Sequence, residues 1–172
     1  NWSAQTSGTT QPLRSVYFIS ATQGWVVGDN GTILTTSNGG SNWVAQTSGT
    51  AQSLRNVHFV SSTHGWAVGN SGTIITTSNG GSTWVAQTSN TSSGLLSVHF
   101  INATHGWAVG NSGAIVATSN GGSTWATQNS NITEQVSSIF FTNATQGWAA
   151  VNGSNGSILT TTDGGSTWTT ES

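Results

Sequence analysis

Apolar residues gather along the chain in short runs that polar turns separate. Residues 54–60, with the letters LRNVHFV, predict one strand, and the runs at 65–69 and 73–77, GWAVG and TIITT, predict two more. Because Asn and Gly tolerate positive φ angles, Asn70 and Gly72 favour a tight turn between the last two strands. No apolar period of 3.6 residues persists, and β-branched residues dominate the runs. The pattern therefore predicts an all-β chain.

The same pattern recurs at a fixed period, which two series of tryptophans mark. The first series is spaced 41, 41 and 41 residues apart, and the second is spaced 41, 41, 41 and 43. Four short antiparallel strands in about forty residues are typical of a β-propeller blade. We expect one β-propeller of four four-stranded blades in residues 1–172, with units near 13–48, 54–89, 95–130 and 136–172. The two series are Trp25, Trp66, Trp107 and Trp148, and then Trp2, Trp43, Trp84, Trp125 and Trp168.

The flat apolar faces of these tryptophans predict packing between neighbouring blades. Spacing this regular favours a structural role for most of them, as for the majority of aromatic side chains in folded domains. Stacking on a bound sugar is the alternative for one or two of them.

Residues 1–8 carry one surplus copy of the Trp-bearing fourth strand. Five copies of this strand accompany four copies of the other three, so one copy has no place in a closed set of blades. A closed four-bladed ring is the leading arrangement, and an open stack or a part of a larger ring is the alternative. We expect the strand around Trp2 to mediate self-association, because exposed strand edges recruit other strands. In the competing arrangement, residues 1–7 close the last blade and residues 167–172 are displaced or add as a fifth strand.

A repeated turn precedes each fourth strand and carries a family resemblance. It reads SNGGSNW at 37–43, SNGGSTW at 78–84 and 119–125, and TDGGSTW at 162–168. These segments resemble the Asp-box of sialidase-type (BNR) repeats. Together with GWVVGDNGTILTTSNGG, the whole unit resembles the blades of the photosystem II assembly and stability factor family and its secreted bacterial and archaeal relatives. The resemblance covers nearly the full chain and implies a propeller, but such blades serve many unrelated functions.

The Asp-box residues are interpreted as fold devices rather than as calcium ligands or catalytic groups. A short Asn or Asp side chain accepts hydrogen bonds from backbone N–H groups two residues further on, and the two glycines that follow supply unusual dihedral angles. The four positions are Asn38, Asn79, Asn120 and Asp163.

Charge is almost absent from this chain, and that excludes several functions. Charged residues make up 3% of the sequence, the net charge is −2, and no lysine or cysteine is present. We therefore expect no nucleic-acid partner, no disulfide and no thiolate metal site, and the absence of long apolar runs predicts no membrane insertion. Because the sequence does not start with Met, we expect that a leader has been removed or that the chain is a piece of a longer one.

The sequence contains few of the residues that enzymatic catalysis would need. The resemblance to sialidases implies a cluster of three arginines, a tyrosine and a glutamate, whereas this chain has Arg14, Arg55 and one tyrosine, Tyr17. Photosystem assembly factors carry a basic patch that two arginines cannot build. The carboxylates lie in different turns or near the C-terminus and cannot form an acid/base pair. They are Asp29, Glu134, Asp163 and Glu171.

The histidines form two pairs of equivalent positions, His58 with His99 and His64 with His105. No carboxylate accompanies them, and a metal site needs three or four ligands. The equivalent positions of the other units are assigned to Tyr17, Gln23, Ile139 and Gln146. We therefore expect no catalytic residue, no metal and no cofactor.

Sequons for N-glycosylation are frequent in the predicted turns, at Asn90, Asn102, Asn131, Asn143 and Asn152. Glycans would supply the solubility that charge does not, so we expect a glycoprotein at the cell surface or outside the cell. The main interpretation is a non-enzymatic structural or adhesive repeat protein that assembles with itself into a filament or surface layer, with glycans as further partners. The alternative is a monomeric binding module, either lectin-like or a scaffold for protein assembly.

Overall fold

The computed structural model describes residues 3–153 and 156–171, and it contains four antiparallel sheets of four strands each. In every sheet the strands pair in chain order. The sheets consist of β1 (Leu13–Phe18), β2 (Gly24–Gly28), β3 (Ile33–Thr36) and β4 (Val44–Gln46); β5 (Leu54–Phe59), β6 (Gly65–Gly69), β7 (Ile74–Thr77) and β8 (Val85–Gln87); β9 (Leu95–Phe100), β10 (Gly106–Gly110), β11 (Ile115–Thr118) and β12 (Ala126–Gln128); and β13 (Gln135–Phe141), β14 (Gly147–Asn152), β15 (Ile158–Thr161) and β16 (Thr169–Glu171).

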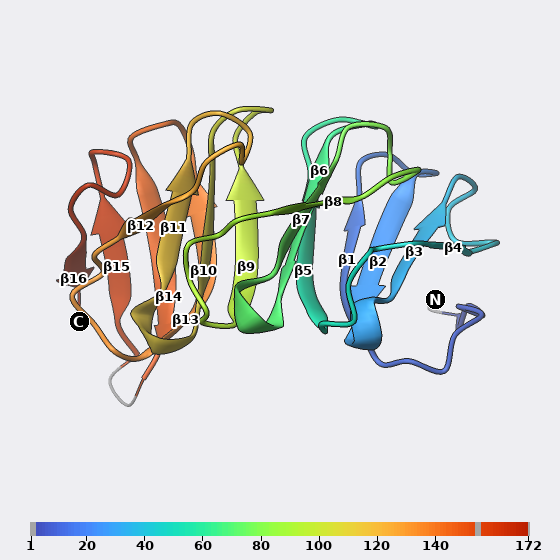
Figure 1. The fold of residues 1–172 in the computed structure, drawn as a ribbon, viewed down its shortest axis with the longest axis horizontal. Coiled ribbons are helices and arrows are strands. Elements are labelled where there is room, and N and C mark those ends of the chain that lie inside the picture. The colour runs from blue at the N-terminus through green and yellow to red at the C-terminus, as the bar shows by residue number, and fades with distance from the viewer. Residues whose placement is uncertain (1–2, 154–155, 172) are drawn as a thin grey trace.

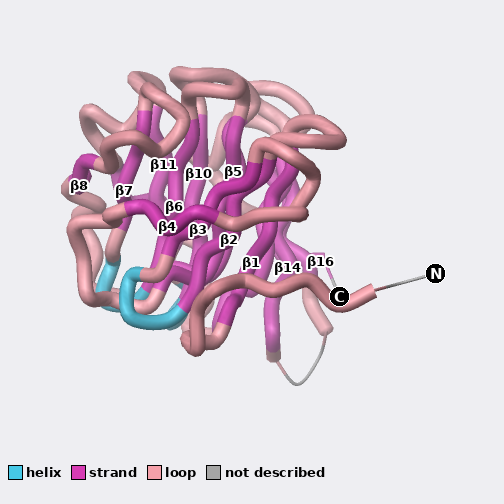
Figure 2. The backbone as a smooth tube through the Cα atoms, turned by 90° about the vertical axis from the view of Figure 1, so that its right-hand side faces the viewer, coloured by secondary structure: helices cyan, strands magenta, loops and turns pink. Residues whose placement is uncertain are grey.

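Each sheet is one blade, and the expected β-propeller of four four-stranded blades is confirmed. The first strands of successive blades lie side by side, β1 against β5, β5 against β9, and β9 against β13. The blades follow one another in a row, with the chain ends at its opposite ends (Figure 1). This arrangement is the open stack that the sequence left as an alternative to a closed ring. Short 3-10 turns between the second and third strands lie along one edge of the blades (Figure 2).

The core lies between the blades rather than within them. Trp25, Val27 and Ile33 of the first blade pack against the second blade, where Phe59 stacks on the Trp25 ring at a centroid distance of 3.5 Å. The same parallel stack recurs at 3.5 Å at both later junctions, for Trp66 with Phe100 and for Trp107 with Phe141. The apolar face of a sheet is shielded from water only when another sheet covers it. The regular repeat of the sequence therefore produces blades that pack on one another in the same way at every junction.

Each Asp-box turn is closed by a side-chain hydrogen bond whose donor lies further along the chain than the sequence analysis expected. The Asn38 Oδ1 accepts the backbone N–H of Asn42, four residues on, at 2.9 Å, whereas the sequence suggested two residues. The cause is the positive φ of Gly39 and Gly40, 71° and 89°, which turns the chain back so that the later N–H faces the side chain. The equivalent bonds of Asn79, Asn120 and Asp163 also measure 2.9 Å.

The surplus N-terminal segment does not complete the last blade. Its described part, residues 3–12, forms no strand, and Trp2 lies outside the described residues. The last blade is completed by its own β16, which pairs with β15 through Ile158 opposite Glu171. The intramolecular arrangement in which residues 1–7 replace β16 is therefore not the one that the structure adopts.

Candidate functional site

A row of rings runs along the first strands of the blades, where neighbouring blades approach most closely. Tyr17, His58, His99 and Phe140 follow one another with centroid distances of 4.9, 5.1 and 4.7 Å. The sequence assigned Ile139 to the last place in this row. The register corrects it, because Phe140 lies opposite Trp148 just as His99 lies opposite Trp107.

Burial keeps the two histidines of this row neutral. It lowers the pKa of His58 to about 4, with a smaller contribution from the charge of the neighbouring His99, and it also lowers the pKa of His99. The Nδ1 of His99 accepts the backbone N–H of Phe141 at 3.3 Å, and the Nδ1 of His58 is buried without a hydrogen-bond partner among the described residues. Neutral, stacked rings are suited to packing between strands rather than to proton transfer at neutral pH.

The remaining titratable groups are scattered or already paired. Arg14 donates to both carboxylate oxygens of Asp29, at 2.9 and 2.6 Å, and this contact lowers the pKa of Asp29. Arg55 donates to Asn70 Oδ1 at 3.0 Å. Hydrogen bonds from Thr167 and Thr161 lower the pKa of Asp163 to about 2, which leaves it a turn-closing carboxylate. Both arginines are thus engaged in local contacts rather than presenting a free basic patch.

Metal binding has no geometric basis in the part of the chain that the structure describes. In residues 3–153 and 156–171, no three histidine, aspartate or glutamate side chains are grouped so that they could hold an ion. His64 and His105 lie in separate turns, where each Nδ1 contacts the preceding threonine hydroxyl, at 3.0 and 2.9 Å. The same described residues contain no helix with the length and apolarity needed to cross a membrane.

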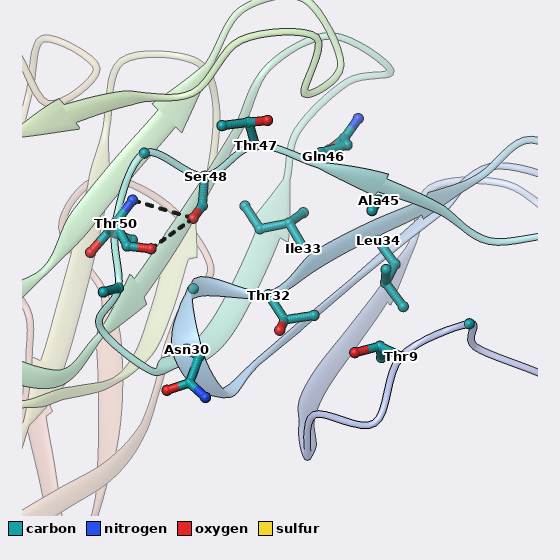
Figure 3. Close-up of a pocket in the computed structure, with 14 residues that line it drawn as sticks. Thr9, Asn30, Thr32, Ile33, Leu34, Ala45, Gln46, Thr47, Ser48 and Thr50 are labelled. Atoms are coloured by element: carbon teal, nitrogen blue, oxygen red, sulfur yellow. Dashed lines mark hydrogen bonds between the residues drawn. The ribbon is translucent and has the colours of Figure 1, made fainter.

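Grooves open beside the third and fourth strands of the first three blades. The largest, in the first blade, has a volume of about 610 Å³. It lies between β3, β4, the chain that leads on to the second blade, and the N-terminal residues Gly8 and Thr9 (Figure 3). Equivalent grooves of about 460 and 270 Å³ are lined by the matching residues of the second and third blades. Since the same segments make each groove, the repeat creates a series of similar sites.

The chemistry of the first groove is neutral. Ala45 is exposed in the groove, Ile33 and Leu34 lie buried at its floor, and hydroxyl and amide groups surround them (Figure 3). The Ser48 hydroxyl binds the N–H and the carbonyl of Thr50, at 3.3 and 3.1 Å, and so holds the chain at the rim in place. No charged side chain lines this groove among the described residues. Such a surface fits an uncharged ligand with alternating apolar and hydrogen-bonding groups.

The fourth strands border these grooves and form the outer edges of the blades. β4 and β8 each have three residues, and their first residues, Val44 and Val85, are strongly exposed. The outward edge of such a strand carries backbone donors and acceptors without a neighbouring strand, and an extended peptide can pair with it. The grooves and the strand edges are therefore adjacent and chemically compatible.

The tryptophans that the sequence predicts to be structural differ in how deeply they are buried. Trp43 is half-buried and Trp148 is exposed, whereas the other described members of both series are buried, namely Trp25, Trp66, Trp84, Trp107, Trp125 and Trp168. The exposed member belongs to the last blade, which has no following blade in the described chain. Sugar stacking is therefore sterically open to Trp148, while the buried members are engaged in packing.

The sequons lie on the surface but differ in what their amides do. Asn102 and Asn143 are exposed, and each Oδ1 accepts N–H groups of its own turn at 2.8 and 2.9 Å. The Nδ2 of Asn90 donates to the carbonyl of Trp125 at 2.7 Å, so a glycan on that nitrogen would require this bond to break. Asn131 and Asn152 are exposed. Glycosylation at these positions stays a prediction.

Comparison with protein families identifies the repeat. The family model described as "Photosynthesis system II assembly factor YCF48" matches residues 86–172, half of the chain. The BNR-type resemblance drawn from the sequence is thereby confirmed. The expected extracellular or cell-surface location is wrong, because this family is described as an assembly factor of a photosynthetic complex rather than as a surface protein. A search of curated proteins finds no match.

Comparison with solved structures gives the same fold. YCF48 bound to a D1 peptide superimposes with a TM-score of 0.76 at 21% identity, over 95% of this chain and 54% of that one. YCF48 from Cyanidioschyzon merolae gives 0.73 at 22% identity, over 95% and 57%. A GH74 enzyme from Niastella koreensis gives 0.67 at 17% identity, over 92% and 30%. The chain thus spans little more than half of the YCF48 structures, and these identities establish the fold alone.

Sequence reasoning missed the grooves. Most of each groove's lining comes from one blade and the connector after it, and the connector before that blade adds two residues, for instance Gly49 and Thr50 in the second blade. The available signal was the connector of small polar residues after the fourth strand, TSGTAQ at 47–52 and TSNTSS at 88–93, to which the sequence analysis assigned no binding role.

Proposed function

Because this chain belongs to the family of the photosynthesis system II assembly factor YCF48, we propose that it is a protein-binding module that holds an extended segment of another polypeptide during the assembly of a larger complex. The observation that carries the proposal is the family match, together with a relative of the same fold whose structure contains a bound peptide. This is the binding-module alternative of the sequence analysis, and it has more support than a self-assembling structural or adhesive protein.

The groove of the first blade is the proposed contact surface. An extended peptide presents side chains on alternate sides and a backbone donor or acceptor at every residue. The exposed Ala45 offers an apolar contact, and the exposed Thr47 and the backbone edge of β4 offer hydrogen bonds beside it. Since charge is absent from this lining, we propose a neutral segment that combines apolar and small polar residues.

The proposed function includes no catalysis. The GH74 relatives of the same fold are enzymes, but glycoside hydrolysis needs two carboxyl groups that flank one bond. Here Asp29 is paired with Arg14, Asp163 closes a turn of the fourth blade, and Glu171 contacts the Thr160 hydroxyl at 3.3 Å. The fourth carboxylate, Glu134, accepts the backbone N–H of Thr133 at 3.1 Å, so each carboxylate has a local contact, and each belongs to a different turn or strand.

Fluorescence anisotropy with labelled peptides tests this function. The probes are a D1 peptide, a neutral peptide of alternating apolar and polar residues, and a scrambled acidic peptide as the reference. We expect the neutral peptide to bind more tightly than the acidic one. Equal or absent binding of all three peptides would contradict the proposed function.

A pair of variants on β4 tests the site itself. Ala45→Arg fills the groove with a long charged side chain, whereas Val44→Arg places the same side chain one residue earlier, on an exposed position outside the groove lining. We expect A45R to weaken peptide binding by about tenfold or more, because an unpaired charge then faces an apolar ligand. V44R should bind like the parent chain. Equal effects of the two variants would place the peptide elsewhere on the blades.

A further inference from the structure

The two ends of the blade row expose apolar side chains that are buried at every internal junction. On the first blade, Val16 and Phe18 are 60% and 41% exposed. Their equivalents on the second blade, Val57 and Phe59, are 2% and 1% exposed because the first blade covers them. We call this surface of β1, formed by Leu13, Val16 and Phe18, the leading face. Figure 2 looks onto this end of the row.

The last blade exposes the side chains that, in the other blades, pack against the following blade. Trp148 and Ile158 are 37% and 47% exposed, whereas Trp25 and Ile33, which hold these positions in the first blade, are 0% and 1% exposed. We call the surface formed by Trp148, Ala150 and Ile158 the trailing face. Inside the chain, a trailing face meets a leading face three times, and each time the tryptophan stacks on the phenylalanine at 3.5 Å.

The leading face is also shaped to receive a blade. A hollow of about 270 Å³ is lined by Leu13, Arg14, Ser15, Val16 and Val26. At the next junction, Val27 and Ile33 of the preceding blade pack against Leu54 and Val57, the equivalents of the hollow's walls. The free leading face thus lacks only the side chains that a trailing face provides, and Ala150 and Ile158 occupy the corresponding positions on the last blade.

The N-terminal segment lies where the fourth strand of a preceding blade would lie. The Gln5 Nε2 donates to the carbonyl of Gly39 at 3.3 Å. At the internal junctions, the same bond runs from a fourth-strand glutamine to the next blade, for instance from Gln46 to Gly80 at 3.1 Å. The carbonyl of Gly80 accepts in addition the indole N–H of Trp25 at 3.1 Å. The carbonyl of Gly39 is therefore set to accept a tryptophan indole from a preceding blade.

The fourth strand of the last blade lacks the group that this junction needs. Glu171 lies opposite Ile158 in the register where Gln46 lies opposite Ile33. A carboxylate has no N–H group and cannot donate to the carbonyl of Gly39. The donor is instead already present as Gln5, on a segment whose residues 1–7 repeat residues 42–48 nearly letter for letter.

From these observations we propose that the chain associates with a second copy of itself, with the trailing face of one copy packed on the leading face of the other. Trp148 stacks on Phe18 of the second copy and donates its indole N–H to the carbonyl of Gly39. Residues 3–5 of the second copy then pair with β15 in place of Thr169–Glu171, with Gln5 opposite Ile158. The interface adjoins the peptide groove, whose lining includes Gly8 and Thr9 of the same N-terminal segment, but it uses the end faces and residues 3–5, so the inference does not depend on the proposed function.

The curvature of the row indicates two copies. The four blades superimpose on 54% of the YCF48 chain, so two such rows amount to slightly more than one such propeller, and a ring of two copies has eight blades. Propellers with up to about eight blades are known, and head-to-tail contacts form a ring when the rotation closes. With a net charge of −2 and 3% charged residues, two copies approach with little electrostatic repulsion. A second copy therefore completes both free faces at once.

The mass of the purified chain, measured by light scattering over a wide range of concentration, tests the interface. We expect twice the mass of one chain. Trp148→Asp and Val16→Asp, which place a charge on the trailing and the leading face, should each give single chains with the thermal stability of a folded domain. Val85→Asp, an equally exposed valine outside both faces, should leave the doubled mass unchanged.

Mixing the two face variants distinguishes this contact from any other. W148D retains an intact leading face and V16D an intact trailing face, so an equimolar mixture should form a species of one W148D and one V16D chain. A parent chain that stays single at every concentration overturns the proposal, and both faces are then left to further blades of a longer polypeptide. A mixture that stays as single chains overturns the head-to-tail geometry, and an open polymer of the parent chain overturns the two-copy ring.

Discussion

Tyr17, His58, His99 and Phe140 hold one repeat position, and the surroundings of each ring decide its chemistry. Their rings stack from blade to blade at 4.7 to 5.1 Å, so the position works as a column of flat side chains. A histidine suits it only in the neutral form, because a charge in the column would be desolvated without a partner. Tyrosine at one end and phenylalanine at the other show that an apolar ring is sufficient there.

Acid should destabilise the chain through His58. Its pKa is about 4 in the fold and 6.5 ordinarily, so between these values the unfolded chain binds a proton that the folded chain does not. The stabilisation is complete above pH 6.5 and is lost as the pH falls to about 4. We expect this loss to be roughly 1–3 kcal/mol, and His58→Phe to abolish most of it.

Chemical denaturation at several pH values between 4 and 7 measures this effect. His64→Gln serves as the control, since His64 lies in a turn rather than in the column and its counterpart in the first unit is Gln23. If H58F and H64Q lose stability in acid to the same extent as the parent chain, the buried ring is not the cause.

At the scale of elements, a strand pair is too small to be stable alone, and the blade junction supplies the missing core. Every junction repeats the same three contacts: a stacked Trp–Phe pair, a second tryptophan set edge-on to the phenylalanine, and a glutamine that joins the two blades. At the second junction Phe100 lies 5.8 Å from Trp125, whose indole donates to Gln87 Oε1 at 3.1 Å. The stability of a blade therefore depends on its neighbours.

Removing one stacked tryptophan should show this dependence. Trp66 is buried, stacks on Phe100 and donates its indole N–H to Gly121 at 3.2 Å. We expect Trp66→Ala to cost about 3–5 kcal/mol of unfolding free energy. Trp148→Ala, at the equivalent but exposed position, should cost about 1 kcal/mol or less when measured on single chains. Similar losses in urea denaturation for both variants would mean that Trp148 is covered within a single chain.

At the scale of the whole molecule, the blades form an open row with two unlike ends. This chain covers little more than half of each YCF48 structure, and the faces at both ends of its blade row are exposed. Both observations indicate that the four blades do not bury all of their own apolar surface. Large exposed apolar surfaces in a folded protein are typical of interaction sites. The peptide groove lies along the blade edges and stays accessible when the ends are covered.

Deleting residues 1–8 should weaken association without unfolding the blades. The described part of this segment forms no strand and holds the first blade through the Gln5 bond to Gly39. We therefore expect the truncated chain to melt close to the parent and to be a single chain in light scattering at concentrations where the parent is doubled. A truncated chain with the doubled mass would show that the faces associate without strand exchange, and one that unfolds would assign the segment to the core of the first blade.

Much of the fold follows from local patterns. The four-stranded unit, its period and the turn residues are properties of neighbouring positions, so the propeller, the number of blades and the Asp-box turns could be predicted. The neutral surface and the absence of a free basic patch follow from the counts of charged residues. The place of Phe140 in the ring column follows from the same period, since Phe140 lies 41 residues after His99, and the pairing with β14 confirms it against the assignment of Ile139. The exposure of Trp148 could not be predicted, because it depends on whether another blade lies against that side chain.

That this protein is a series of similar blades follows from its sequence alone, because a repeat of one hydrophobic pattern specifies one kind of junction. Which blade faces remain exposed is a property of the tertiary fold. Val16 and Val57 hold the same repeat position, in LRSVYF and LRNVHF, yet Val16 is exposed and Val57 is buried, since burial depends on whether a blade lies against the strand. The two free faces lie where no further blade covers the row, whereas the contacts that join the units link residues 34 positions apart in the chain, such as Gln5 with Gly39 and Gln46 with Gly80.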